Sequence, residues 1–266
     1  MACLVAVGVG AAPNAVAATS NSIYSYTLAN YDASSVANEA AANTAVRLQL
    51  VGNWGPGVLG VEFSGNRVSS QSVAYARPST GNTINVGAGQ AVGVAIKFRY
   101  TAPVGRSCFT DSPNLTQIGR FGTGLSQVKL QLSNCQTTPG SVRAQCRIAG
   151  AQSTTSQMPK TATRALLNGA TYVVHCYEGP KVLGGRTLVM KTTQVGSTTT
   201  TDQFTVAAPG AITSTGYLSI ANKYPLPSAA SNNTDQYVGD VAKVSYCQGA
   251  SLLAASSCLG TEIPGG

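Results

Sequence analysis

The chain has 266 residues, of which only 10% are charged, and its 17 basic and 9 acidic residues give a net charge of +8. All-β domains commonly reach this length, and no Gly/Ser linker or run of charge divides the chain, so we expect one domain. Strong helix formers are scarce, which argues against a helical bundle. The basic residues are scattered rather than clustered, so we expect no nucleic-acid partner.

Residues 1–18 form an apolar stretch without Lys or Arg that ends in Ala15-Val16-Ala17, the small-x-small pattern that signal peptidase accepts. We interpret them as a signal peptide whose positively charged start lies upstream; a short buried strand or helix is the alternative. The stretch is too short to cross a bilayer core of about 30 Å as a helix, and no later segment is suited to do so. We therefore expect a secreted or cell-surface protein without a transmembrane segment.

Segments with strand-like alternation follow this leader and are separated by turn-forming clusters of Gly, Pro, Asn and Ser. Alternation with a period of two places successive side chains on opposite faces of a sheet. It is clearest in residues 91–100, 126–132 and 142–148. The expected strands, in chain order, are residues 23–28, 46–51, 58–63, 91–100, 115–121, 126–132, 142–148, 171–177, 186–195, 217–221 and 236–246.

Many strands at short spacing, without intervening helices, predict an all-β fold built as a two-sheet antiparallel sandwich. Residues 33–42 are the only stretch that looks helical, and they lack a capping signal. We place the sandwich domain at residues 19–249 and a C-terminal tail at residues 250–266.

The order of several short segments resembles the concanavalin A-like lectin/glucanase superfamily, in particular laminin-G-like domains of exported actinobacterial proteins. The resemblance implies a jelly-roll sandwich stapled by disulfides. Two positions depart from the pattern: Thr171 replaces a tryptophan, and Ala242 replaces an acidic residue. The segments that carry the resemblance are residues 60–65 (GVEFSG), 91–100, 142–148 with 169–176, 218–223 (LSIANK) and 236–241 (QYVGDV).

With Cys3 assigned to the leader, an even set of six cysteines remains, and exported thiols are normally oxidised. A zinc site is the alternative, but no C-x-x-C or H-x-x-x-H spacing is present. We predict that a first disulfide joins inward positions on neighbouring strands, that a second closes a C-terminal loop, and that the remaining two cysteines form the third. These pairs are Cys146–Cys176, Cys247–Cys258 and Cys108–Cys135.

Hydrolytic members of the superfamily carry an E-x-D-x-E strand, because an acid and a nucleophile must flank one glycosidic bond. The present sequence lacks this strand, and a pair assembled from distant positions would use Glu62 and Asp240. A polysaccharide lyase would need Arg, His and Tyr together, and His175 and Tyr177 share a strand face. A structural role for His175 is the simpler interpretation, so we expect a non-catalytic domain.

Calcium is the cofactor that the resemblance suggests, because sites in laminin-G-like domains and legume lectins use Asp and Asn oxygens. The candidates are Asp202, Asn232 and Asp235, which lie in segments rich in oxygen ligands. No D-x-D-x-D loop accompanies them.

If Cys146 lies opposite Cys176 in one antiparallel pair, Arg147 lies opposite His175 on the face away from the core. Alternation turns further basic side chains the same way, and the predicted basic face comprises Lys129, Arg143, Arg147, His175, Tyr177 and Lys191. We expect this face to attract an anionic glycan, or else to be only a solvated surface. Trp54 is suited to stacking on a sugar or to plugging the end of the sandwich.

Two functional hypotheses follow. The first is a binding domain for a carbohydrate or cell-envelope polymer, and the second is a rigid exported module without a small ligand. An enzyme ranks third. An aromatic platform on the surface would favour the binding hypothesis.

Overall fold

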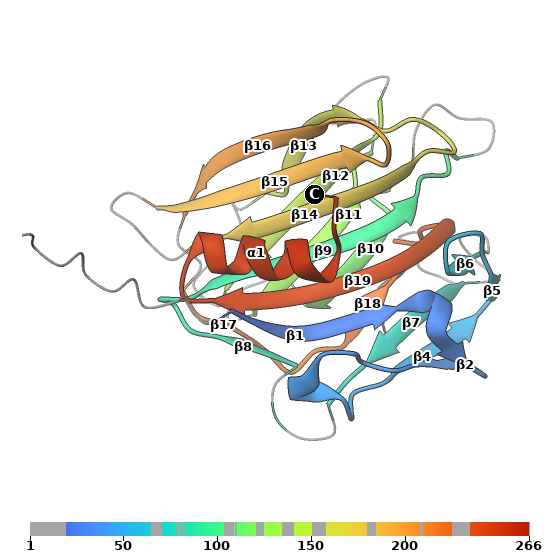
Figure 1. The fold of residues 1–266 in the computed structure, drawn as a ribbon, viewed down its shortest axis with the longest axis horizontal. Coiled ribbons are helices and arrows are strands. Elements are labelled where there is room, and N and C mark those ends of the chain that lie inside the picture. Colours follow the sequence, from blue (N-terminus) through green and yellow to red (C-terminus); the bar gives the residue numbers. More distant parts are fainter. Residues whose placement is uncertain are drawn as a thin grey trace, which may run out of the picture.

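The computed structural model describes residues 20–64, 71–78, 81, 83–103, 109, 111–120, 125–134, 141–150, 158–179, 185–207, 210–224 and 235–265. In this part of the chain, two large antiparallel sheets pack face to face, and one α-helix, α1 (Leu252–Glu262), lies across the outside of one sheet (Figure 1). The all-β jelly-roll sandwich predicted from the sequence is therefore confirmed. The described residues contain no helix long and apolar enough to span a membrane.

The eight-stranded sheet of the described chain contains most of the long strands. Its order is β16 (Thr199–Val206), β15 (Arg186–Gln194), β14 (Thr171–Glu178), β9 (Ala91–Arg99), β19 (Gly239–Gly249), β6 (Val61–Phe63) and β5 (Trp54–Pro56), and β1 (Ser20–Thr27) also pairs with β19. The first and last long strands of the chain thus lie side by side near the middle of this sheet, which joins the two ends of the domain (Figure 1).

The opposing sheet has nine strands within the described residues. Its order is β13 (Lys160–Ala165), β12 (Arg143–Ala149), β11 (Gln127–Leu132), β10 (Asn114–Gly119), β18 (Leu218–Ile220), β7 (Ser72–Ala76), β4 (Leu48–Gly52), β3 (Ser35–Val36) and β2 (Tyr31–Asp32). A small third sheet pairs β8 (Ile84–Val86) with β17 (Ile212–Ser214). The stretch that looked helical contains β3, and a 3-10 turn begins at its end, at Ala41–Asn43.

The core lies between the two large sheets and is filled by the inward side of the predicted alternation. Ile96 and Phe98 of β9 and Val128 and Leu130 of β11 belong to this one buried cluster. A hydroxyl pair crosses the core as well, because Thr116 Oγ1 lies 2.7 Å from the phenolic oxygen of Tyr246. Burying such apolar surface is the main favourable term for the fold, at roughly 25 cal/mol per Å².

The predicted disulfide between Cys146 and Cys176 is present, but it connects the two sheets rather than neighbouring strands of one sheet. Cys146 of β12 lies opposite Leu130 of β11, and Cys176 of β14 lies opposite Val94 of β9. The period-two pattern identified both cysteines as inward-facing, but it cannot tell which sheet a strand joins.

The C-terminal tail forms the helix α1, which the sequence analysis did not predict. Cys247 of β19 and Cys258 of α1 form the second predicted disulfide. The hydroxyl of Ser251 accepts a hydrogen bond from the Ala254 N–H and caps the first turn. The helix packs on β1, β9, β14 and β19, so the tail covers the outer face of the eight-stranded sheet. Cys108, Cys135 and the proposed signal peptide lie outside the described residues.

The free edges of the two sheets are joined at β13 and β16. The Thr163 N–H donates to Asp202 Oδ2 at 3.0 Å, and Arg164 Nε donates to the Thr200 hydroxyl at 2.9 Å. An unpaired strand edge invites pairing with another chain, and these cross-links cover both edges at once.

We predict that removing the inter-sheet disulfide in a Cys146→Ala, Cys176→Ala double variant lowers the free energy of unfolding by about 3–4 kcal/mol, because its loop spans 30 residues. Urea unfolding followed by tryptophan fluorescence measures this loss. The matched control is the Cys247→Ala, Cys258→Ala variant, whose shorter loop of 11 residues gives a smaller loss. An unchanged midpoint in the first variant contradicts the prediction.

Candidate functional site

The predicted basic face is not one face. Lys129, Arg143 and Arg147 project from the outer surface of the nine-stranded sheet, where Lys129 lies directly opposite Arg147. His175 and Lys191 lie opposite each other in the eight-stranded sheet, on the other side of the molecule. The prediction of a shared face is wrong because it placed Cys146 and Cys176 in one sheet.

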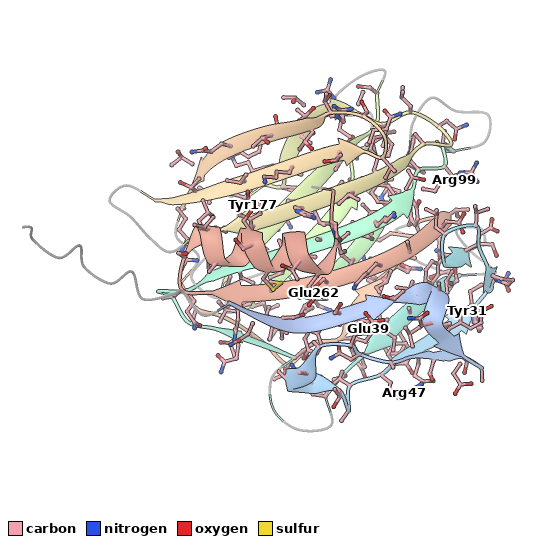
Figure 2. All side chains as sticks on the ribbon, viewed as in Figure 1. Tyr31, Glu39, Arg47, Arg99, Tyr177 and Glu262 are labelled. Atoms are coloured by element: carbon pink, nitrogen blue, oxygen red, sulfur yellow. A yellow bond between two sulfur atoms is a disulfide. The ribbon has the colours of Figure 1, made fainter. Side chains whose placement is uncertain are left out.

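Tyr177 of β14 packs against α1 (Figure 2), and His175 of the same strand is buried beside Ile263, which directly follows the helix. His175 is 1% exposed, and its Nε2 lies 3.0 Å from the carbonyl oxygen of Ile263. Tyr177 packs with Leu259 of α1 in a second apolar cluster. Burial lowers the pKa of His175 to about 4, so the ring is neutral at pH 7. These contacts give His175 a structural role.

Trp54 packs edge-on against Tyr31, with ring centroids 5.5 Å apart, and is partly buried against the main core. Glu62 and Asp240 lie directly opposite each other in the β6–β19 pair, as the hypothesis of a distant carboxylate pair requires. Glu62 is exposed, whereas Asp240 is buried and lies opposite Arg99 on its other side. Neither residue lines the tyrosine-rich hollows described below.

The residues proposed for calcium do not fit a shared site. Asp202 of the eight-stranded sheet already accepts the Thr163 N–H, whereas Asp235 lies 3.7 Å from the Lys129 ammonium and 3.5 Å from that of Lys223. Asn232 lies outside the described residues. Within those residues, no group of three or more His, Cys, Asp or Glu side chains could hold a metal ion.

A different site emerges on the nine-stranded sheet, where two adjoining hollows share Arg77 and Tyr217. The first has a volume of about 430 Å³ and the second about 540 Å³. We call them together the tyrosine groove. The first hollow is lined by Arg77, Gly119, Arg120, Leu125, Ser126, Thr213, Ser214, Thr215, Gly216, Tyr217 and Tyr224, and the second by Arg47, Gln49, Tyr75, Ala76, Arg77, Pro78 and Tyr217.

Three tyrosines form one aromatic cluster in this groove. The rings of Tyr75 and Tyr224 stack with centroids 3.7 Å apart, and Tyr217 meets both edge-on, at 5.7 Å from Tyr75 and 4.6 Å from Tyr224. A hydrogen bond with Tyr75 raises the pKa of Tyr224, so its hydroxyl stays protonated at neutral pH. The cluster presents ring surface and phenolic hydroxyls at one place.

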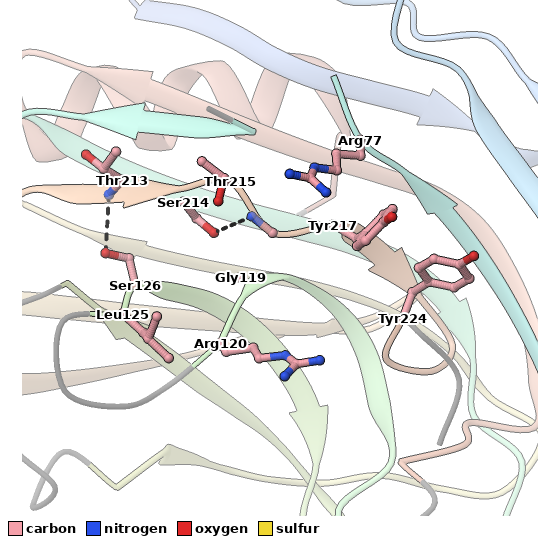
Figure 3. Close-up of a pocket in the computed structure, with 11 residues that line it drawn as sticks. Arg77, Gly119, Arg120, Leu125, Ser126, Thr213, Ser214, Thr215, Tyr217 and Tyr224 are labelled. Carbon is pink, nitrogen blue, oxygen red and sulfur yellow. Dashed lines mark hydrogen bonds between the residues drawn. The ribbon is translucent and has the colours of Figure 1, made fainter. Parts of the chain in front are cut away.

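Two arginines flank the aromatic cluster. Arg77 lies over the ring of Tyr217 with its guanidinium carbon 5.4 Å from the centroid, a cation–π geometry. Figure 3 shows Arg77 and Arg120 on opposite sides of the first hollow, with Tyr217 and Tyr224 at one end. Neither guanidinium has a hydrogen-bond or ion-pair partner among the described residues, and the described lining contains no acidic side chain.

The backbone around the first hollow is held by short local contacts. Ser126 Oγ accepts the Thr213 N–H at 3.2 Å, and Ser214 Oγ accepts the Gly216 N–H at 3.0 Å (Figure 3). Gly119 has a φ of +73°, and a Cβ there would lie 2.1 Å from the Ser126 carbonyl oxygen. Glycine is therefore required at the turn that carries Arg120.

Sequence reasoning missed this cluster, although part of it has a local signal. Tyr75 of β7 and Arg77, directly after the end of this strand, are two residues apart, the spacing that places side chains on one face of a strand. Tyr217 and Tyr224 flank β18, which pairs with β7 through Ser219 opposite Tyr75. That pairing joins segments more than a hundred residues apart, and nothing in the local sequence specifies it.

No family model matches the sequence, and no curated protein matches it. Among solved structures, the binding domain of Paraclostridial Mosquitocidal Protein 1 is similar, with a TM-score of 0.51 and 9% identity over 91% of this chain and 52% of that chain. The present chain thus spans about half of that domain.

Two further solved structures resemble the chain with lower scores. The basic winged bean lectin, solved with Tn-antigen, has a TM-score of 0.44 and 14% identity over 76% of this chain and 92% of the lectin. The PL-14 alginate lyase from Aplysia kurodai has a TM-score of 0.41 and 10% identity over 86% and 97%, respectively. At such identities these likenesses concern the fold alone.

The buried His175 predicts a specific pH dependence. Its pKa falls from 6.5 to about 4 on folding, so the unfolded chain binds more protons in this interval and stability is lost as the pH falls through it. The loss amounts to about 2–3 kcal/mol at pH 4.5. Urea unfolding at pH 7 and pH 4.5, compared with a His175→Gln variant, isolates this contribution. Equal losses in both proteins would show that His175 does not contribute.

Proposed function

We propose that the chain is a secreted, non-catalytic domain that binds an acidic polysaccharide, such as a cell-envelope polymer, in the tyrosine groove. The observation that carries the proposal is the combination, in two adjoining hollows, of three clustered tyrosines with two arginines that have no hydrogen-bond or ion-pair partner among the described residues. We also propose, from the resemblance in the order of its sequence segments, that the chain is related to laminin-G-like domains of exported actinobacterial proteins. The two disulfides among the described residues are consistent with an oxidising compartment.

The tyrosines support a carbohydrate ligand. A sugar ring has an apolar face of C–H groups and a rim of hydroxyls, and a tyrosine offers both a ring surface and a polar handle. Tyr217 and Tyr224 are half-buried, so their rings are held in place while part of each remains accessible. Ligand sites typically combine such aromatic surface with a few convergent polar groups.

The arginines support an acidic ligand. Arg77 and Arg120 are exposed, and a guanidinium pairs with a carboxylate or sulfate through two parallel hydrogen bonds. Arg47 in the second hollow is already fixed by hydrogen bonds to the Ser35 hydroxyl, which orients its charge. The net charge of +8 adds a long-range attraction for polyanions.

The chemistry of the groove favours binding over catalysis. Neither a carboxylate nor an imidazole lies in its described lining. The remaining candidate bases are the phenolic hydroxyls, and the raised pKa of Tyr224 keeps that hydroxyl protonated and a poor proton acceptor at neutral pH. A polyuronate would therefore be held without being cleaved.

We expect the protein to bind polygalacturonate more tightly than the neutral glucan laminarin. Tyr217→Ala and Arg77→Gln should each weaken polygalacturonate binding about tenfold, a loss of about 1.4 kcal/mol, because each removes a ring face or a charge that the glycan contacts. Affinity electrophoresis and titration calorimetry measure the change.

Tyr31→Ala and Arg99→Gln are the matched controls, because they remove a tyrosine and an arginine that do not line the groove and should leave binding unchanged. Added salt should weaken binding by wild type more than by Arg77→Gln. If no acidic or neutral glycan binds the folded protein, the hypothesis of a structural module without a ligand replaces this proposal.

A further inference from the structure

Four neighbouring strands of the nine-stranded sheet place residues of the tyrosine groove at one end of the sheet. Arg77 directly follows β7, and Tyr217 directly precedes β18, which pairs with β7. Arg47 directly precedes β4 on the other side of β7, and Arg120 directly follows β10 on the other side of β18. Antiparallel neighbours start and finish at the same end of a sheet, so these residues lie in a row. Their order along it is Arg47, Arg77, Tyr217 and Arg120.

Direct contacts hold this row together and give it its length. The guanidinium carbon of Arg77 lies 5.4 Å from the ring centroid of Tyr217, and the Gly119 N–H donates to the Tyr217 carbonyl oxygen at 3.4 Å. Neighbouring strands are about 4.8 Å apart, so three steps place the backbone of Arg47 roughly 14 Å from that of Arg120. The row is therefore longer than a single sugar ring.

The two hollows of the tyrosine groove alternate with the arginines of the row. Arg77 and Arg120 lie on opposite sides of the first hollow (Figure 3), and Arg77 and Arg47 both line the second. Gly119 and Gly216 line the first hollow without a side chain to fill it. All three arginines are exposed, so a ligand can approach them from solvent along the whole row.

The three arginines keep hydrogen-bond donors free for a ligand. Arg47 donates to the Ser35 hydroxyl from Nε at 3.3 Å and from Nη2 at 2.8 Å, and its Nη1 has no partner among the described residues. The cation–π contact of Arg77 with Tyr217 needs no hydrogen-bond acceptor, so the N–H groups of Arg77 remain available for an oxyanion. The described lining holds no acidic side chain, so a ligand with several acidic groups would offset the repulsion among the three positive charges.

We propose that the tyrosine groove has two successive sugar subsites, and that a linear polyuronate binds across the strand ends with its carboxylates at Arg47, Arg77 and Arg120. The inference rests on the proposed function and adds the class of acidic glycan, an unbranched chain with a carboxylate on each sugar. Tyr75 lines the second hollow and Tyr217 lines both, so sugar rings contact tyrosines while their carboxylates contact arginines. Arg77 binds the acidic group at the junction of the two subsites.

Two subsites predict that the arginines at the ends of the row respond differently to ligands of different length. Arg47→Gln and Arg120→Gln should each weaken binding of a galacturonate hexasaccharide about fivefold, because each removes one exposed ion pair. A galacturonate disaccharide, which fills one subsite, should respond to only one of these two variants. Titration calorimetry measures the hexasaccharide affinity, and an NMR titration measures the weaker disaccharide complex.

The salt dependence gives a second measurement of the same contacts. The affinity for a polyanion falls with added salt in proportion to the number of ion pairs formed, so the hexasaccharide should show a flatter salt dependence with Arg47→Gln and with Arg120→Gln than with wild type. A methyl-esterified hexasaccharide keeps the sugar rings without the charges and should bind more weakly than the free acid. Arg99→Gln removes an arginine of the eight-stranded sheet and is the control that should change neither affinity nor salt dependence.

The outcomes separate this inference from the proposed function. If Arg47→Gln or Arg120→Gln folds normally and leaves the hexasaccharide affinity unchanged while Tyr217→Ala weakens it, one hollow suffices, so the two-subsite proposal is wrong and the tyrosine groove stands. A disaccharide that responds to both end variants would also overturn the two subsites, because it would indicate one compact site. If no acidic oligosaccharide binds the folded wild type, both proposals are wrong.

Discussion

The contact between the two sheets through their inward side chains is the constraint on which the rest of the molecule depends. Each strand gives alternate residues to the core, so the other half of its side chains is committed to an outer face. Ile96 and Phe98 from one sheet and Val128 and Leu130 from the other share one buried cluster, and Cys146–Cys176 fixes the same contact covalently. A slip of one residue in any strand would exchange core and surface, so this packing also determines which charged residues can meet a ligand.

One outer face is covered by α1 and the other is not, because only the eight-stranded sheet has small residues where a helix can approach. On β9, Gly93 and Ala95 point away from the core, and a Cβ on Gly93 would lie 2.7 Å from Leu259 of α1. The small side chains let the helix approach and bury His175 and Tyr177. On the nine-stranded sheet, the outward positions of β11 and β12 are Gln, Lys and Arg, and β7 contributes Tyr75. That face therefore remains the polar one and holds the tyrosine groove.

The distribution of the few acidic residues gives the groove its charge. Glu178 pairs with Arg186 at 3.3 Å in the interior, and Asp202 joins the sheet edges. Glu39 and Glu262 both lie within 3.6 Å of Lys243 beside α1 (Figure 2). These structural contacts lie away from the groove, and Asp235 pairs with Lys129 and Lys223. Positive charge is therefore in excess at the tyrosine groove, whose described lining includes Arg47, Arg77 and Arg120 and no acidic residue.

The sequence by itself determined the elements whose signals are local. Alternation in residues 91–100, 126–132 and 142–148 identified β9, β11 and β12 with the correct inward faces. With the even cysteine count, the inward positions predicted Cys146–Cys176, and the short C-terminal loop predicted Cys247–Cys258. The tertiary structure alone decided which strands share a sheet, because strand pairing depends on contacts between segments far apart in the chain. For this reason the local sequence could not predict that His175 and Arg147 lie on different sheets. The helix Leu252–Glu262 is short and contains Ser, Thr and Gly beside its Leu and Ala residues, so it depends on its packing against β19. Tyr75, Tyr217 and Tyr224 meet only because β7 pairs with β18, and no local pattern encodes that register.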